Sequence, residues 1–145
     1  MTGNSSKEMK RFNHLYSEID AVYHEAALKF GLSDSVSIIL YTICSFGDSI
    51  LLNDICRSTG LSKQTVNSAI RGLERDNIVY LKAVDGKSKM VCLTEKGKRF
   101  CEKTAFRLIK IENDIFESWS AADVRKYLEL TEKYLTSINE KVRQL

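Results

Sequence analysis

The spacing of apolar positions predicts a helix at each end of the chain and a more apolar helix between them. Residues 7–30 carry apolar side chains every three or four positions, which is the period of an amphipathic helix. Residues 121–144 repeat this spacing in near-heptad order. Residues 34–46 are apolar on nearly every side, so we expect that helix to lie in the middle of a domain.

The segment 50–76 predicts two short helices joined by a tight turn. The first covers about Asn53 to Thr59, and the second runs from Lys63 to about Asp76. Gly60 suits the left-handed position that ends a helix, and Ser62 can cap the helix that follows. The buried face of the second helix is fixed by apolar residues at helical spacing, namely Val66, Ala69, Ile70 and Leu73.

Beyond this helix the apolar period becomes that of a β-strand. Residues 78–83 and 88–93 predict two strands, and Asp85-Gly86 between them is a strong signal for a hairpin. A third long helix is then predicted over about 95–117.

The order of these elements predicts a mainly α (α+β) fold, the winged helix-turn-helix. The hairpin is its two-stranded β-hairpin wing, and long N- and C-terminal helices flank it. We expect residues 33–103 to form the winged helix-turn-helix module. Residues 1–32 and 104–145 form a separate helical region in this interpretation.

Composition argues against several classes of protein. The chain has 145 residues, of which 43% are hydrophobic and 28% charged, so we expect one ordinary globular domain with helical additions. The four cysteines form no C-x-x-C pair, and the two histidines lie ten positions apart on one predicted helix, so no metal site is expected. Neither a catalytic constellation nor a phosphate-binding loop is recognisable, so we expect no enzyme and no cofactor.

The chain is also not expected to enter a membrane. It has no run of about 18 apolar residues, which a membrane-spanning helix would need. The first twelve residues lack the apolar segment of a signal peptide. A cytoplasmic location with reduced thiols is therefore the expectation.

Charge is unevenly distributed along the chain. The net charge of +3 is too small to indicate a partner, but residues 57–103 hold 11 basic and 5 acidic residues, a net charge of +6. The remaining residues carry 11 basic and 14 acidic residues, a net charge of −3. The basic part coincides with the predicted second helix and hairpin, which points to double-stranded DNA as the partner.

The outward face of the second helix carries side chains that can hydrogen-bond the edges of bases. Asn and Gln pair with adenine, Arg pairs with guanine, and Ser with several acceptors. An ordinary solvated helix face would also be polar, so this face alone does not decide the function. The candidate DNA-binding residues are Gln64, Asn67, Ser68, Arg71 and Arg75, with Lys63 and Thr65 beside them.

The predicted wing adds a second candidate surface. Lys87 and Lys89 lie near its tip and Lys82 on the preceding strand, while Asp85 is the acid that opposes them. Lysines on a thin projection can contact DNA phosphates or enter a narrow minor groove. They would also protect an exposed strand edge from pairing with another chain. Next to the polar helix face, we interpret Lys82, Asp85, Lys87 and Lys89 as a DNA-binding wing.

These motifs resemble the MarR family of bacterial transcriptional regulators. The stretch 91–97 (VCLTEKG) is the most specific part of the resemblance, and the others are 60–66 (GLSKQTV), 73–79 (LERDNIV) and 85–87 (DGK). Asn77 stands where the family usually has Gly. Lys87 stands at the Arg position of the family's D-x-R pattern, which keeps the charge but loses the planar five-donor group.

The resemblance implies a repressor or regulator that forms an obligate homodimer through its N- and C-terminal helices. Such a dimer would bind a near-palindromic operator with half-sites about one helical turn apart. Family members often bind a small aromatic acid or another effector, which loosens their hold on DNA; no residue is assigned to that role here. Some members sense oxidants through a cysteine near the N-terminus, but residues 1–43 contain none.

Two alternatives stay open at this point. A winged helix can serve as a protein-interaction module that does not bind DNA. A thiol-based redox sensor is the other alternative, acting through one of the residues Cys44, Cys56, Cys92 and Cys101.

Overall fold

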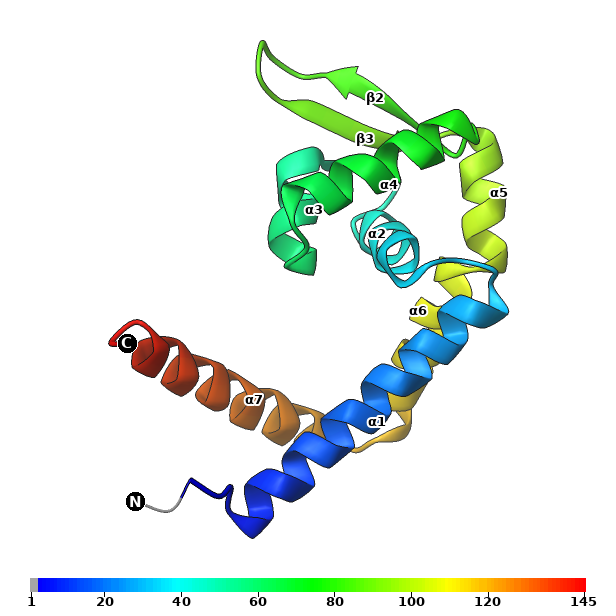
Figure 1. Cartoon of the computed structure of the whole chain (residues 1–145). Coiled ribbons are helices and arrows are strands. Elements are labelled where there is room, and N and C mark those ends of the chain that lie inside the picture. Colours follow the sequence, from blue (N-terminus) through cyan, green and yellow to red (C-terminus); the bar gives the residue numbers. More distant parts are fainter. Residues whose placement is uncertain (1–2) are drawn as a thin grey trace. The chain divides into compact units, whose positions relative to one another are not determined.

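The structure, a computed structural model, describes residues 3–145 (Figure 1). Helices dominate this part of the chain, and three short strands form one antiparallel sheet. The chain divides into two compact units, Met1–Leu108 and Ile109–Leu145, which are described separately below. The predicted fold class, a winged helix-turn-helix with long terminal helices, is confirmed. The elements are α1 (Lys7–Lys29), α2 (Asp34–Ser45), β1 (Ser49–Leu51), α3 (Leu52–Thr59), α4 (Lys63–Arg75), β2 (Val79–Ala83), β3 (Lys89–Leu93), α5 (Glu95–Lys103), α6 (Ala105–Ser118) and α7 (Ala121–Val142).

Helix α2 is the centre of the first unit, as its apolar sequence predicts. Its residues Ile39, Leu40 and Ile43 are completely buried. Helices α3 and α4 pack against it and contribute Ile55 and Val66, which are also completely buried. Because α2 buries five of its twelve residues, it forms a well-packed base on which the helix-turn-helix rests.

The helix-turn-helix forms as the sequence predicts. Gly60 ends α3 in the left-handed conformation, with φ of 68°. Ser62 then caps α4, since its hydroxyl accepts a hydrogen bond from the Thr65 N–H at 3.1 Å. At the other end of α4, Asn77 takes a φ of 58°, a conformation that Asn tolerates better than most residues. Both ends of α4 are therefore fixed by local sequence.

The sheet has one strand more than the hairpin that the sequence predicts. Strand β1 pairs with β3, so the strand order is β1-β3-β2 and both pairings are antiparallel. Ile50 lies opposite Val91, and both side chains are buried. The third strand attaches the base of the hairpin to the segment between α2 and α3, so the wing projects from a fixed root.

The prediction of a single long helix over 95–117 is wrong, because the helix is interrupted at Thr104. That residue has φ of −129° and ψ of −94°, and it separates α5 from α6. Its hydroxyl donates to the Phe100 carbonyl oxygen at 2.9 Å. Apolar spacing continues across the break, which is why the sequence pattern does not reveal it.

The junction of α5 with the α4–β2 turn explains the most specific motif of the chain. Thr94 caps α5 by accepting from the Gly97 N–H at 2.9 Å, and its hydroxyl donates to the Asn77 carbonyl oxygen at 2.7 Å. A Cβ atom on Gly97 would overlap the carbonyl oxygen of Ile78. Glycine at position 97 therefore lets α5 approach the turn that positions the wing.

The second unit, Ile109–Leu145, holds most of α6 and all of α7. Three aromatic rings join the end of α6 to the start of α7: Phe116 and Trp119 lie 5.3 Å apart, and Trp119 and Tyr127 lie 5.6 Å apart. No residue of α7 is buried. This unit therefore has little core of its own.

Within residues 3–145, no single helix is both long and apolar enough to cross a membrane. Among the described helices, one pair, α1 and α2, passes that test of length and composition when taken together, and a 90° bend separates the two.

Candidate nucleic-acid interface

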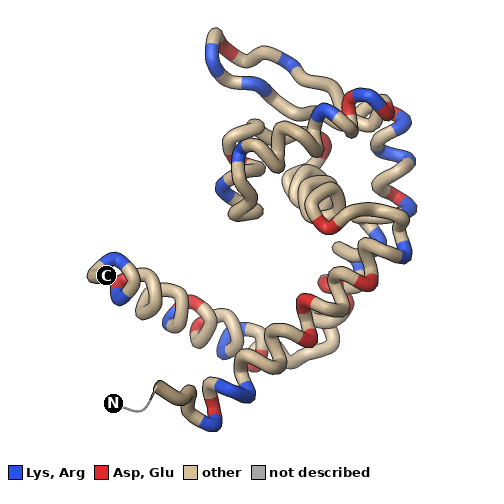
Figure 2. Tube along the Cα trace, viewed as in Figure 1, with Lys and Arg blue, Asp and Glu red and all other residues tan. Residues whose placement is uncertain are grey.

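Helix α4 presents its polar face to solvent, and Figure 2 shows basic residues on this helix and along the wing. The side chains predicted to read bases are accessible. The exposed residues are Lys63, Gln64, Ser68, Arg71 and Arg75, and the half-buried ones are Thr65 and Asn67.

One flank of α4 forms a groove with the wing. The groove has a volume of about 570 Å³, and its walls include Lys63, Asn67 and Arg71 from α4 together with Lys87 and Lys89 from the wing. The Nε atom of Arg71 donates to the Asn67 carbonyl oxygen at 3.4 Å, so the guanidinium lies back along the helix. Two surfaces that the sequence predicts separately thus line one groove.

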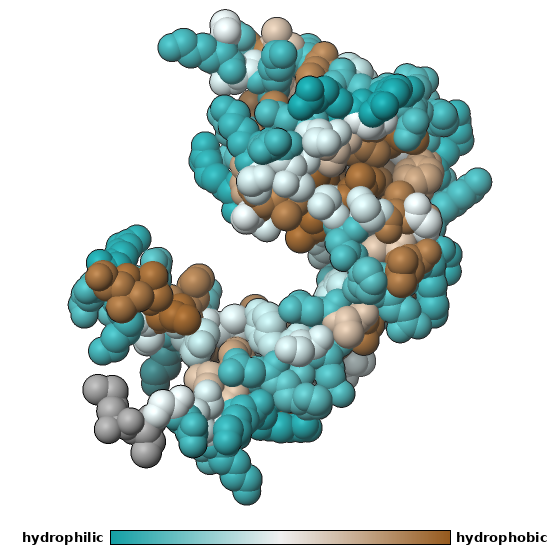
Figure 3. All heavy atoms as spheres, in the orientation of Figure 1, coloured by the Kyte–Doolittle hydropathy of each residue, from teal (hydrophilic) through white to brown (hydrophobic). Residues whose placement is uncertain are grey.

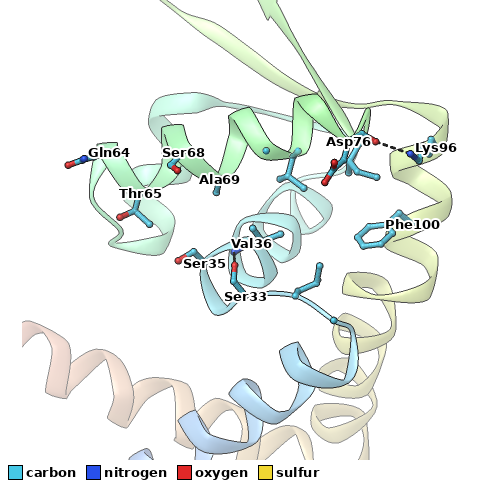
Figure 4. A pocket seen from close by; sticks show the side chains of 15 residues that line it. Ser33, Ser35, Val36, Gln64, Thr65, Ser68, Ala69, Asp76, Lys96 and Phe100 are labelled. Carbon is cyan, nitrogen blue, oxygen red and sulfur yellow. Dashed lines mark hydrogen bonds between the residues drawn. The ribbon is translucent and has the colours of Figure 1, made fainter.

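The other flank of α4 faces a second pocket, of about 820 Å³. Gln64, Thr65 and Ser68 line it on the α4 side. Figure 4 shows Phe100 pointing from α5 into the space below α4, whereas Gln64 points outward near the first turn of α4. The predicted reading residues are therefore divided between the two flanks of the helix.

Further residues from α2 and α5 complete this pocket. Val36 and Phe100 give it apolar walls, and Ser33 and Ser35 add hydroxyl groups. Lys96 also lines the pocket, and its ammonium group donates to the Asp76 carbonyl oxygen at 2.9 Å. The pocket thus combines an aromatic ring, polar groups and one cation next to α4.

The wing carries its three lysines in exposed positions. Lys82, Lys87 and Lys89 are all exposed, and none of the ion pairs found within residues 3–145 involves them. The carboxylate of Asp85 lies at the tip and accepts the backbone N–H groups of Lys87 and Ser88. These two bonds lower the pKa of Asp85 below its ordinary value, so the carboxylate is ionised at neutral pH.

Sequence reasoning missed two residues that line the groove. Asn53 and Arg57 from α3 form part of its wall. The side chain of Arg57 is 78% exposed and lies 3.6 Å from the Asp54 carboxylate. Their spacing of four positions on a predicted helix was a usable signal, because it places both on one face.

The four cysteines are free thiols. Cys44, Cys92 and Cys101 are buried, and Cys56 is half-buried. A hydrogen bond with the Cys101 thiol and burial raise the pKa of Cys44. A protonated, buried thiol is a poor nucleophile. Within residues 3–145 there is no group of three or more His, Cys, Asp or Glu side chains that could hold a metal ion.

The geometry defines a class of protein. Helices α3 and α4, the turn between them and the basic hairpin beside α4 constitute a winged helix-turn-helix, in which α4 occupies the place of the recognition helix.

The comparisons show which family this module resembles. Residues 30–88, from the end of α1 to the wing, match the model of the MarR family. The MarR resemblance of the chain is therefore confirmed. No curated protein matches the chain in sequence.

Several solved structures share the fold over nearly the whole chain. MepR of S. aureus in its DNA-binding conformation has a TM-score of 0.75 and 20% identity, over 92% of this chain and 99% of that chain. The MepR–DNA complex has a TM-score of 0.68 and 19% identity, over 93% and 99% of the two chains. A MarR/EmrR family regulator from Acinetobacter sp. ADP1 has a TM-score of 0.70 and 20% identity, over 92% and 95%.

Proposed function

We propose that this chain is a sequence-specific DNA-binding transcriptional regulator that represses its target genes in the cytoplasm. The observation that carries the proposal is the groove in which Lys63, Asn67 and Arg71 of α4 lie with Lys87 and Lys89 of the wing. Cations attract the phosphate backbone, and the polar groups between them can hydrogen-bond base edges. The MepR structures support it, since one is a DNA complex and another is in a DNA-binding conformation.

Different residues supply the two parts of DNA recognition in this proposal. Gln64, Asn67, Ser68 and Arg71 read bases in the major groove, where each base pair presents a distinct pattern of donors and acceptors. Thr65 and the lysine and arginine residues that do not read bases contact the phosphates, and these contacts fix the position of the protein on the duplex. These anchoring residues are Lys63, Arg75, Lys82, Lys87 and Lys89, and Arg57 joins them from α3.

The proposed assembly is a homodimer. Helices α1 and α7 each leave a row of large apolar side chains at the surface, and a single chain offers little core to cover those of α7. In Figure 3 apolar atoms are exposed on the C-terminal part of α7. A two-fold dimer presents two recognition helices to successive major grooves, which requires a near-palindromic operator. The exposed apolar residues include Phe12, Leu15, Tyr16, Ile19, Val22, Tyr23 and Leu28 on α1, and Tyr127, Leu128, Leu130, Tyr134, Leu135, Ile138 and Val142 on α7.

A small-molecule effector that releases the operator completes the proposed mechanism. The pocket between α2, α4 and α5 supports this part. Phe100 and Val36 suit an aromatic or other apolar ligand, and Lys96 supplies a cation nearby. Because Ser68 and Thr65 of α4 line the same pocket, a bound ligand would displace or reorient the recognition helix.

Replacing Asn67 or Arg71 by alanine tests the assignment of base reading. We expect each variant to lose roughly 1–3 kcal/mol of operator binding, which is about 5- to 150-fold, and to tolerate other bases at one operator position. Lys103→Ala is the control, because it removes an exposed cation of α5 that does not line the groove. Fluorescence anisotropy titration at one fixed salt concentration measures the effect. Unchanged operator affinity in both variants would show that this face of α4 does not read bases.

A further inference from the structure

The tip of the wing is closed by a side chain. The Oδ1 atom of Asp85 accepts hydrogen bonds from the backbone N–H groups of Lys87 and Ser88, both at 2.8 Å. The Val84 N–H donates to the Ser88 carbonyl oxygen at 3.0 Å across the loop. Gly86 is not among the glycines of residues 3–145 that have positive φ. The loop therefore depends on the Asp85 carboxylate and not on a left-handed glycine.

A negative charge at this place conflicts with a simple electrostatic account of the wing. Residues 79–93 contain three lysines and one acid, Asp85, which is exposed at the tip. A carboxylate near phosphates repels them, so by charge alone it would weaken DNA binding. The two hydrogen bonds to the backbone indicate a structural role for the Asp85 carboxylate instead, because one of them fixes the backbone N–H group of Lys87.

We propose that Asp85 is a positioning residue of the wing: it holds the 85–88 loop so that the Lys87 ammonium group meets the DNA backbone, and it makes no DNA contact itself. This rests on the proposed function. It replaces the sequence-based interpretation of Asp85 as a DNA-binding residue. A lysine on an unordered loop would have to lose conformational entropy on binding, whereas a braced loop has lost it already.

The test compares Asp85→Ala with Asp85→Asn. Alanine removes the acceptor, while the amide oxygen of asparagine can accept the same two N–H bonds without the charge. We expect Asp85→Ala to bind operator DNA about five- to ten-fold more weakly although its net charge rises by one, because two hydrogen bonds are lost. Asp85→Asn should bind as tightly as the parent chain or more tightly. Glu102→Ala, which removes an exposed acid of α5, is the control for net charge.

The salt dependence distinguishes positioning from a general weakening of the fold. Lys87→Ala should lower the slope of log K against log salt by about one unit. Asp85→Ala should lower it similarly, and the double variant should bind no more weakly than Lys87→Ala alone. Tighter binding by Asp85→Ala, or an equal loss in Asp85→Ala and Asp85→Asn, would overturn the proposal. Additive losses in the double variant would also overturn it.

A measurement without DNA keeps the proposal separate from the proposed function. Hydrogen exchange of the Lys87 and Ser88 amides should become faster in Asp85→Ala and stay slow in Asp85→Asn. Unchanged exchange in Asp85→Ala would refute the brace even if the protein binds DNA. If the exchange behaves as expected but the parent chain binds no duplex, the brace stands, and both the proposed function and the positioning of Lys87 on DNA fail.

Discussion

Replacing Gly97 by alanine is expected to destabilise the winged helix by about 3 kcal/mol or more, which lies at the upper end of overpacking effects. The new Cβ atom would overlap the Ile78 carbonyl oxygen and lie 3.0 Å from the carbonyl carbon. Both are backbone atoms, so no side chain can rotate to make room. The same shift would disturb the cap in which Thr94 accepts from the Gly97 N–H.

Thermal and urea denaturation measure this effect, and Gly72→Ala is the matched control. A Cβ atom on Gly72 would meet only the Arg75 guanidinium, at 3.8 Å. Because alanine favours helix more than glycine, the control should gain roughly 0.5–1 kcal/mol of stability. If Gly97→Ala were as stable as the parent protein, the close packing of α5 on the α4–β2 turn would be refuted.

Replacing Leu135 by lysine is expected to abolish the proposed dimer and, with it, tight operator binding. Leu135 lies on the apolar face of α7 and is 61% exposed in the single chain. An unpaired charge in an apolar interface costs roughly 3–5 kcal/mol, so dimer affinity should fall at least about 100-fold. A monomer engages one half-site only, so the avidity of two linked sites is lost.

Thr136→Lys is the control for this experiment. It adds the same charge at the next position of α7, which lies about 100° around the helix from Leu135. Sedimentation equilibrium gives the oligomeric state, and an operator titration gives the affinity. Thr136→Lys should remain a dimer that binds the operator. A Leu135→Lys variant that stays dimeric at micromolar concentration would contradict the assignment of this face to the dimer interface.

Local patterns predict the helix-turn-helix, because the elements that form it are close together in sequence. Gly60 and Ser62 act within one turn of their own position, so their roles are visible without the rest of the fold. The sequence does not predict strand β1, because its three residues are too few to show the alternation of apolar and polar positions that marks a strand. Its pairing of Ser49 with Cys92 depends on contacts far apart in sequence. The break at Thr104 lies in the backbone conformation of one residue, and apolar spacing does not report it because the spacing continues across the break.

The candidate site was predictable to a similar degree. Helical geometry alone predicts that Asn67 and Arg71 lie on the outer side of α4. It does not say that these two residues line the groove with the wing while Thr65 lines the pocket on the other flank, because that division depends on how distant elements pack. The hydrogen bonds of Asp85 were predictable from the sequence, because an aspartate in a turn often accepts hydrogen bonds from backbone N–H groups two or three positions later.

Selection of bound duplexes from a random DNA pool tests the central claim, specific DNA binding by a dimer, most directly. We expect a near-palindromic consensus whose half-sites have centres about 10 base pairs apart, and binding that weakens steeply as salt increases. Failure to enrich any sequence, together with no salt-dependent binding to duplex DNA, would contradict the account and favour a protein-interaction module.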